Sequence, residues 1–306
     1  MRVDYLRYFE HLAKVLNYAK AAQDLYIAQP TLSVAIKRME KELGIQLFKR
    51  AGEGVPSQRI ELTETGAILQ EYVAQALNSL DTGLRVAREK QGELNSSVRV
   101  GTIYAMQGRF WSQAIGSFQS SRSNPAKITF KQAYSPNLIT RLRKGELDVI
   151  FAARTENSDD LNHLLVWSQP LVLVVNKENP LAKRKTVTID DLKKYEILTY
   201  AKTSPVYPPF EELLPTNELS LHCDYDDEIT LCAMVSSNKQ NMGLCCYSFL
   251  VKAFEDVATV RIADLPIDFH KVYLISRRET HPKIVEEFIR FMSAYRFPNA
   301  LEVGKF

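Results

Sequence analysis

The first sixty residues carry apolar side chains at helical spacing. One stripe, at intervals of three and four residues, is formed by Tyr5, Leu6, Phe9, Leu12, Ala13 and Leu16, and this spacing predicts an amphipathic helix. A short second helix is expected over residues 19–25. A third is expected from Gln29, with Pro30 in its first turn, to about Leu43, where Gly44 is a typical helix stop.

The two sides of the third predicted helix differ in character. Its apolar side consists of Leu32, Ala35, Ile36, Met39 and Leu43. Its opposite side consists of Gln29, Ser33, Val34, Lys37, Arg38 and Lys41. Because short polar and basic side chains suit base edges and phosphates, the second and third helices together predict a DNA-binding helix-turn-helix.

A β-hairpin is expected after the third helix. Residues 45–50 and 59–62 have strand character, and the stretch between them contains the Gly and Pro residues of a turn. Beside a helix-turn-helix such a hairpin is a wing. Its basic residues Lys49, Arg50 and Arg59 are then placed to contact phosphates or the minor groove.

A long helix is expected next, over 63–92. Thr63 suits its N-cap position, and Glu64 suits the positive end of the helix dipole. A heptad-like row is formed by Leu69, Val73, Ala76, Leu80 and Ala87, and such a row predicts a two-stranded coiled coil and hence a dimer. The alternative is a helix that packs on its own domain. The polar segment 91–97 is expected to be a hinge.

The remaining residues, 97–306, alternate between strand and helix patterns. Strands are expected at 98–103, 128–132, 147–151, 171–175, 196–200, 219–223, 243–246 and 271–276. The last of them precedes an amphipathic helix that carries Ile284, Phe288, Met292 and Tyr295. This alternation predicts an α/β sheet architecture.

The N-terminal 66 residues resemble the DNA-binding head of LysR-type transcriptional regulators. The matching segments are Leu6-Arg7-Tyr8-Phe9, Ala21-Ala22-Gln23-Asp24-Leu25, Gln29-Pro30-Thr31-Leu32-Ser33, Ile36-Lys37-Arg38-Met39-Glu40, Glu42-Leu43-Gly44, Leu47-Phe48-Lys49-Arg50 and Leu62-Thr63-Glu64-Thr65-Gly66. The resemblance implies that Gln29, Pro30, Thr31 and Ser33 lie in the major groove and that Arg50 lies at the backbone or minor groove. Val34 stands where the family often has arginine, and the wing is longer than usual, so both features bear on which DNA sequence is recognised.

The rest of the chain resembles the effector domain of the same family, which is built like a two-lobed, type 2 periplasmic binding protein. The matching segments are Lys144-Gly145-Glu146-Leu147-Asp148-Val149, Gln169-Pro170-Leu171-Val172-Leu173-Val174, Asn179-Pro180-Leu181-Ala182 and Asp190-Asp191-Leu192. The expected domains are a winged helix-turn-helix over 1–62, a linker and dimerisation helix over 63–92, and an effector domain over 97–306. Lobe one would comprise 97–166 and 269–306, and lobe two 167–268, with crossings near Trp167 and Asp268.

Such a cleft binds ligands where strand ends meet helix N-termini, whose free N–H groups attract anions. The candidate effector-binding residues are Thr102, Ile103, Tyr104, Tyr134, Ser135, Lys202, Thr203 and Ser204. They predict a small effector, anionic in character, with an aromatic wall formed by Tyr104, Tyr134, Tyr200 and Tyr207. The alternative roles are helix caps for Ser135 and Ser204 and core positions for the tyrosines.

Composition and charge refine this interpretation. The 306 residues carry a net charge of +3, but residues 1–60 alone carry a surplus of four basic groups, which favours a polyanion as partner of the head. The four cysteines are expected to be reduced thiols in a cytoplasmic protein without a signal peptide or membrane segment. A cluster of carboxylates is formed by Asp224, Asp226, Asp227 and Glu228. The favoured interpretation is that they cap the N-terminus of a helix, and the alternative is a role in metal binding or acid–base chemistry. No cofactor, metal site or catalytic motif is expected.

The leading hypothesis is a LysR-type regulator that is not an enzyme. Its dimer, assembled to a tetramer as in the family, would bind double-stranded promoter DNA, and a small molecule in the cleft would shift the assembly between two arrangements. One alternative is a ligand-independent DNA-binding protein with a vestigial cleft. Another is an enzyme fused to a DNA-binding head.

Overall fold

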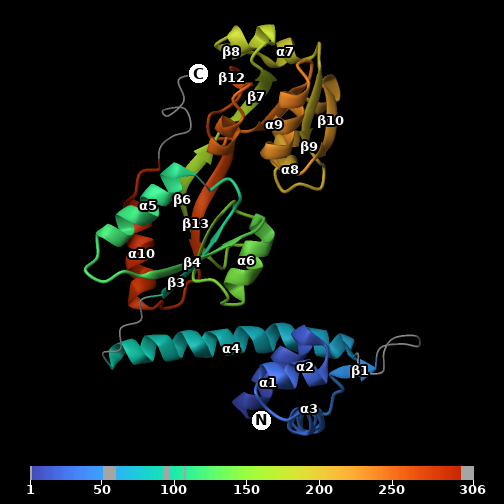
Figure 1. Cartoon of the computed structure of the whole chain (residues 1–306), viewed down its shortest axis with the longest axis vertical. Helices are drawn as coiled ribbons and strands as arrows, with labels where there is room; N and C mark the ends of the chain where they lie inside the picture. The colour runs from blue at the N-terminus through green and yellow to red at the C-terminus, as the bar shows by residue number, and fades with distance from the viewer. Residues whose placement is uncertain (1, 51–59, 92–96, 107, 298–306) are drawn as a thin grey trace. The chain divides into compact units, whose positions relative to one another are not determined.

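The computed structural model describes residues 2–50, 60–91, 97–106 and 108–297 (Figure 1). The side chains of Arg50, Lys90 and Arg109 lie outside this description. The chain divides into two compact units near residue 93. Among the helices described, none combines the length and the apolar character needed to span a bilayer.

The first unit is a small helical domain with a hairpin. Its elements are α1 (Val3–Val15), α2 (Tyr18–Asp24), α3 (Gln29–Leu43), β1 (Phe48–Arg50), β2 (Ile60–Leu62) and α4 (Glu64–Lys90). Phe9, Leu12, Leu32, Ile36 and Met39 are fully buried in its core. The expected apolar side of the third helix is therefore buried, with one exception. Leu43, in the last turn, is 37% exposed and does not belong to the core.

Local hydrogen bonds fix the ends of these helices. Asn17 caps α2 by accepting from Lys20 N at 3.0 Å, and Gly44 ends α3 in the left-handed region with φ 70°. Thr63 caps α4, as expected, by accepting from Gly66 N at 2.9 Å. A Cβ at position 66 would overlap the carbonyl oxygen of Leu47, so only glycine fits where α4 begins.

The wing strands pair antiparallel and are held against α3. Phe48 faces Leu62, and Arg50 faces Ile60. The Glu40 carboxylate on α3 accepts hydrogen bonds from Leu47 N at 2.8 Å and from Phe48 N at 3.3 Å. The tip of the wing, residues 51–59, lies outside the described residues.

The predicted heptad row of α4 divides into two parts. Val73 is buried in the core of the first unit, and Leu69 packs against that core. Ala76, Leu80 and Ala87 are exposed. The beginning of the row therefore packs on its own domain, which was the alternative interpretation, and the remainder leaves apolar side chains uncovered.

The second unit contains two sheets, each the centre of a lobe (Figure 1). In lobe one the strand order is β4-β3-β5-β13-β6. The strands are β3 (Ser97–Thr102), β4 (Lys127–Gln132), β5 (Val149–Ala152), β6 (Asn162–Gln169) and β13 (His270–Ser276). The helices of this lobe are α5 (Arg109–Ser120), α6 (Ser135–Arg143) and α10 (Lys283–Ala294).

Lobe two has the strand order β10-β9-β11-β7-β12-β8. Its strands are β7 (Leu171–Asn176), β8 (Thr186–Val187), β9 (Glu196–Tyr200), β10 (Ser220–Tyr225), β11 (Met242–Cys246) and β12 (Val257–Ile262). Its helices are α7 (Ile189–Leu192), α8 (Tyr207–Leu213), α9 (Glu228–Ser237) and the 3-10 turns η1 (Pro180–Lys183), η2 (Thr216–Glu218) and η3 (Phe249–Ala253).

Three strands, β6, β8 and β12, were not predicted from the sequence. Strand β6 carries lobe one as far as Gln169, and the chain passes to β7 of lobe two at Pro170, close to the expected crossing near Trp167. Strands β6 and β13 pair antiparallel, His270 opposite Gln169, and these two residues mark the places where the chain passes between the lobes.

Lobe one also holds a buried ion pair. Asp148 is fully buried and accepts from Arg99 at three points: Nη2 at 2.7 Å, Nε at 3.2 Å and the backbone N at 2.8 Å. Because both carboxylate oxygens are paired, the Asp148 of the family-like Gly145–Asp148 segment has a structural role.

Candidate functional site

The exposed side of α3 carries the residues predicted to contact DNA. Gln29, Pro30, Thr31, Val34, Lys37 and Arg38 are exposed, and Ser33 is half-buried. Arg38 pairs with Glu42 at 3.3 Å in this state of the protein. The side chains point away from the core of the first unit, so a groove of DNA can reach them.

The wing contributes one described basic side chain. Lys49 is exposed and lies 3.7 Å from Glu61. The backbone of Arg50 lies in β1, whereas its side chain and the whole of Arg59 lie outside the described residues. Tyr26, in the turn before α3, is almost fully exposed, with φ 54°.

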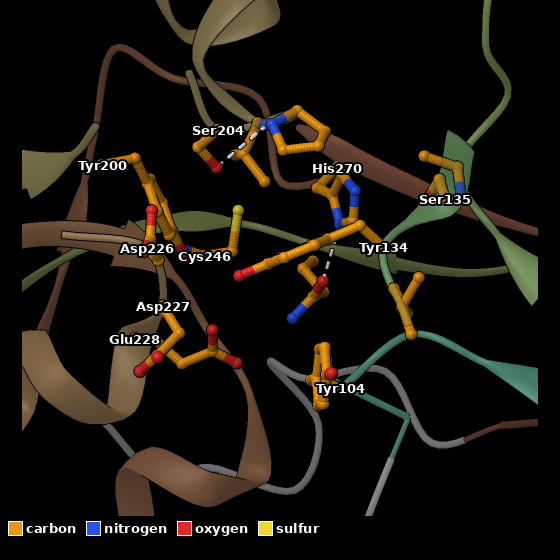
Figure 2. Close-up of a pocket in the computed structure, with 16 residues that line it drawn as sticks. Tyr104, Tyr134, Ser135, Tyr200, Ser204, Asp226, Asp227, Glu228, Cys246 and His270 are labelled. Carbon is orange, nitrogen blue, oxygen red and sulfur yellow. Dashed lines mark hydrogen bonds between the residues drawn. The ribbon is translucent and has the colours of Figure 1, made fainter. Parts of the chain in front are cut away.

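The second unit contains a cavity between the two lobes, shown in Figure 2. Its empty space measures about 590 Å³, open mouth included. Lobe one lines it with Ile103, Tyr104, Ala105, Tyr134, Ser135, Ala153, Gln169 and His270. Lobe two lines it with Tyr200, Ser204, Pro205, Val206, Asp226, Asp227, Glu228 and Cys246.

Five of the eight predicted effector residues line this cavity. They are Ile103, Tyr104, Tyr134, Ser135 and Ser204. Thr102 does not, because it is buried in the sheet of lobe one. Lys202 and Thr203 do not either, since they are the exposed central residues of a turn that closes with Ser204 N donating to Ala201 O at 2.8 Å.

The tyrosines expected in the wall also divide. Tyr200 lines the cavity. Tyr207 is buried in the core of lobe two, stacked on Phe210 at 5.8 Å between ring centroids, so its core alternative holds. Both serines line the cavity, and neither hydroxyl caps a helix: Ser135 Oγ accepts from Ala153 N, after β5, at 3.0 Å, and Ser204 Oγ accepts from Val206 N, before α8, at 3.4 Å.

A short hydrogen-bond chain fixes the protonation of His270. Gln169 Nε2 donates to Tyr247 O at 2.8 Å, so Gln169 Oε1 is the atom that faces His270 Nδ1 at 2.7 Å. Nδ1 must therefore carry the proton, and Nε2 of a neutral ring is left as an acceptor. Burial lowers the pKa of His270 to about 4, which keeps the imidazole neutral at pH 7.

Three consecutive carboxylates form one side of the cavity, facing Tyr104 and Tyr134 in Figure 2. Asp227 caps α9, as expected, by accepting from Thr230 N at 2.7 Å. Glu228 is only 8% exposed, and its Oε1 has no hydrogen-bond partner within the described part of the chain. Burial raises the pKa of Glu228, although its own backbone N–H and the nearby Ser248 hydroxyl oppose this shift.

The opposite side of the cavity is aromatic. Tyr104 and Tyr134 meet edge to face, 5.6 Å between ring centroids, and are 44% and 41% exposed. The pKa of Tyr134 is raised, first by partial burial and then by the negative charges of Asp226 and Asp227. The negative charges of these carboxylates therefore raise the pKa of a tyrosine on the other side of the cavity.

One thiol belongs to the lining. Cys246 is buried, its backbone N donates to Tyr200 Oη at 3.0 Å, and burial raises the pKa of its thiol. A thiol with a raised pKa holds little thiolate at pH 7 and is a poor nucleophile. Within the described residues no group of three or more His, Cys, Asp or Glu side chains is arranged to hold a metal ion.

Sequence reasoning missed several lining residues. Asp226 and Glu228 were expected to cap a helix and were not predicted to line the effector cavity. Gln169 and His270 are 101 positions apart and meet only through the pairing of β6 with β13, so no local pattern could join them.

Comparison with known proteins agrees with both units. The family model of the LysR substrate binding domain matches residues 91–296, and that of the bacterial regulatory helix-turn-helix proteins of the lysR family matches residues 3–67. A relative described as the uncharacterized HTH-type transcriptional regulator YybE of Bacillus subtilis is 28% identical over 236 residues, covering 74% of this chain and 76% of that protein.

Solved structures share the fold. CbnR in complex with its target DNA superposes with a TM-score of 0.69 at 20% identity, covering 96% of this chain and all of that one. The effector-binding domain of QuiR in complex with shikimate has a TM-score of 0.59 at 20% identity, covering 66% of this chain and 97% of that one. The chain is therefore a member of the LysR family, a transcriptional regulator and not an enzyme, with a helix-turn-helix DNA-binding domain followed by a two-lobed effector-binding domain.

Proposed function

We propose that this regulator contacts promoter DNA with the exposed side of α3 and with the wing. The proposed contact residues are Gln29, Pro30, Thr31, Ser33, Val34, Lys37, Arg38, Lys49, Arg50 and Arg59. The observation that carries this proposal is the division of α3: Leu32, Ile36 and Met39 are buried, whereas the polar and basic side is open. Polar groups suit base edges, and the basic ones suit phosphates.

The exposed apolar row of α4 supports a dimer. Ile68, Tyr72, Leu80 and Leu84 are large apolar side chains left 40% or more exposed on one helix, with Ala76 between them. We infer that a second copy of the chain covers the exposed part of the predicted row, Ala76, Leu80 and Ala87, together with the neighbouring Leu84. A symmetric dimer would present two α3 helices to two half-sites on DNA, and a tetramer would combine two such dimers.

We propose that a small-molecule effector occupies the cavity of the second unit and shifts the regulator between two arrangements in the cytoplasm. The cavity is bounded by both lobes, so a ligand there contacts groups on each side of the two crossings. This makes a ligand-independent protein with a vestigial cleft the weaker alternative, because Glu228 Oε1 is buried in the lining without a partner among the described residues and Tyr104 is 44% exposed there.

A footprint of the full-length protein on the DNA upstream of its own gene, at two salt concentrations, tests the DNA-binding role. We expect a protected site with approximate two-fold symmetry that weakens at the higher salt. The double variant Gln29→Ala, Ser33→Ala is the control for the assignment of α3. If this variant protects the same site equally well, α3 is not the helix that recognises the sequence.

A further inference from the structure

We propose that the cavity takes an organic cation with N–H donors, a protonated amine, and not an anion. The inference rests on the proposed function, that an effector occupies this cavity. It reverses the charge expected from the sequence, which relied on hydroxyls and on the free backbone N–H groups at helix N-termini.

The charged groups that line the cavity are all acidic. They are Asp226, Asp227 and Glu228, and none of the described side chains in the lining is a lysine or arginine. Lys202 lies in the exposed turn outside the lining. His270 adds an uncharged acceptor, because its Nε2 lacks the proton that Nδ1 donates to Gln169. An anion in this space would meet like charges, whereas a ligand with N–H donors would meet acceptors.

Glu228 gives the clearest sign of a missing partner. Its Oε1 is buried in the wall and has no hydrogen-bond partner among the described residues. A buried carboxylate oxygen without a donor is unfavourable, and the partner that satisfies it best is a charged N–H group. The N-terminus of α9, where an anion would bind, is already occupied by the Asp227 carboxylate that caps it.

The aromatic side fits the same ligand class. Tyr104 and Tyr134 present partly exposed rings to the cavity, directly across from the carboxylates (Figure 2). Aromatic rings attract cations, and the attraction is larger in a desolvated site than at an exposed one. A cavity with one acidic and one aromatic wall therefore selects an organic ammonium group. A bare metal ion is disfavoured, since no cluster of ligands among the described residues could hold one.

The experiment measures binding of three probes of one shape and different charge to the full-length protein: benzylamine, benzyl alcohol and benzoate. Isothermal titration and the thermal midpoint of the effector domain report binding of each. We expect benzylamine to bind and to raise the midpoint, with benzoate at least about tenfold weaker, which corresponds to about 1.4 kcal/mol.

Three variants identify the responsible groups. Glu228→Gln and Asp226→Asn each remove one negative charge from the lining, and we expect each to weaken benzylamine by about tenfold because a charge-assisted contact is lost. Asp224→Asn is the matched control, since it removes the same charge from an exposed position outside the lining. It should leave benzylamine binding unchanged.

The outcomes distinguish the proposal that the ligand is a cation from the proposal that the cavity binds an effector. If benzoate or benzyl alcohol binds as well as benzylamine, or if Glu228→Gln and Asp226→Asn bind benzylamine like the parent protein, the cation inference is overturned and the cavity remains a ligand site. If none of the three probes binds at millimolar concentration, the effector role proposed for the cavity is contradicted as well.

Discussion

Two buried carboxylates, one in each lobe, stand in opposite situations. Asp148 in lobe one accepts three hydrogen bonds from Arg99, and both of its oxygens are paired. Glu228 in lobe two is buried to a similar degree, yet its Oε1 has no partner among the described residues and it lines the cavity. A buried charge with all its partners holds a fold together, whereas one that lacks a partner destabilises the empty protein and can be satisfied by a ligand.

The largest effect is expected from Asp148→Ala. Removing one member of a buried ion pair costs about 3 kcal/mol of unfolding free energy, the lower end of the usual range because Arg99 is 31% exposed. Urea unfolding of the effector domain measures this loss. Asp159→Ala, which breaks an exposed pair with Arg154 in the same lobe, should cost less than about 1 kcal/mol. Equal losses for the two variants would show that the burial of Asp148 contributes nothing.

The polar side chains of α3 differ from both buried carboxylates, because Gln29 is exposed to water and Ser33 is half-buried in the free protein. The variant Gln29→Ala, Ser33→Ala should lose about 1–3 kcal/mol of specific DNA binding and almost no stability. Gel-shift titration against specific and unrelated DNA measures the first, and thermal unfolding the second. A large drop in the thermal midpoint would place these side chains in the structure of the head and not in its DNA contact.

Glu228→Gln should behave opposite to Asp148→Ala. We expect the glutamine variant to be about 1 kcal/mol more stable than the parent at neutral pH, because it removes a buried charge whose Oε1 has no partner among the described residues. Since the folded-state pKa of Glu228 is raised, its favourable protonated form is present below about pH 4 and is lost as the pH rises through that raised value. Stability curves of both proteins should therefore converge toward pH 4. A variant less stable than the parent at pH 7 would mean that the carboxylate is paired after all.

The smallest effect is expected at a polar group that is paired but near solvent. Thr63→Ala removes the cap of α4 and should cost about 1 kcal/mol. The loss should be confined to the first unit, so hydrogen exchange is expected to rise at the start of α4 and to stay unchanged in the effector domain. Thr63→Ser, which keeps the hydroxyl, is the matched control and should restore most of the protection.

The same comparison explains how far the sequence could lead. The α3 surface follows from one helical period, so its buried residues Leu32, Ala35, Ile36 and Met39 were all predicted. The cavity is assembled from segments that are far apart in sequence, and only the residues beside predicted strand ends were found. Lys202 and Thr203 do not line this cavity because the chain turns after β9, where both residues are exposed.

Strand β6 was missed for a related reason. Its pairing with β13 shifts register between Val272 and Tyr273, and the shift interrupts the alternation by which a strand is recognised. The expected crossing near Trp167 therefore falls within the last residues of β6, which ends at Gln169. The charge of the expected ligand could not be predicted from the sequence either. A row of acidic residues at the start of a helix has the same sequence pattern whether it caps the helix or faces a ligand.

The unpartnered Oε1 of Glu228 has a consequence for the rate at which the protein is degraded. A ligand that satisfies it stabilises only the folded chain, and proteases act on the small fraction of molecules that is unfolded at any moment. We therefore expect the empty regulator to be degraded faster than the occupied one. In the cell its abundance would rise with the supply of its effector, so the number of molecules available at a promoter would carry the signal along with their conformation.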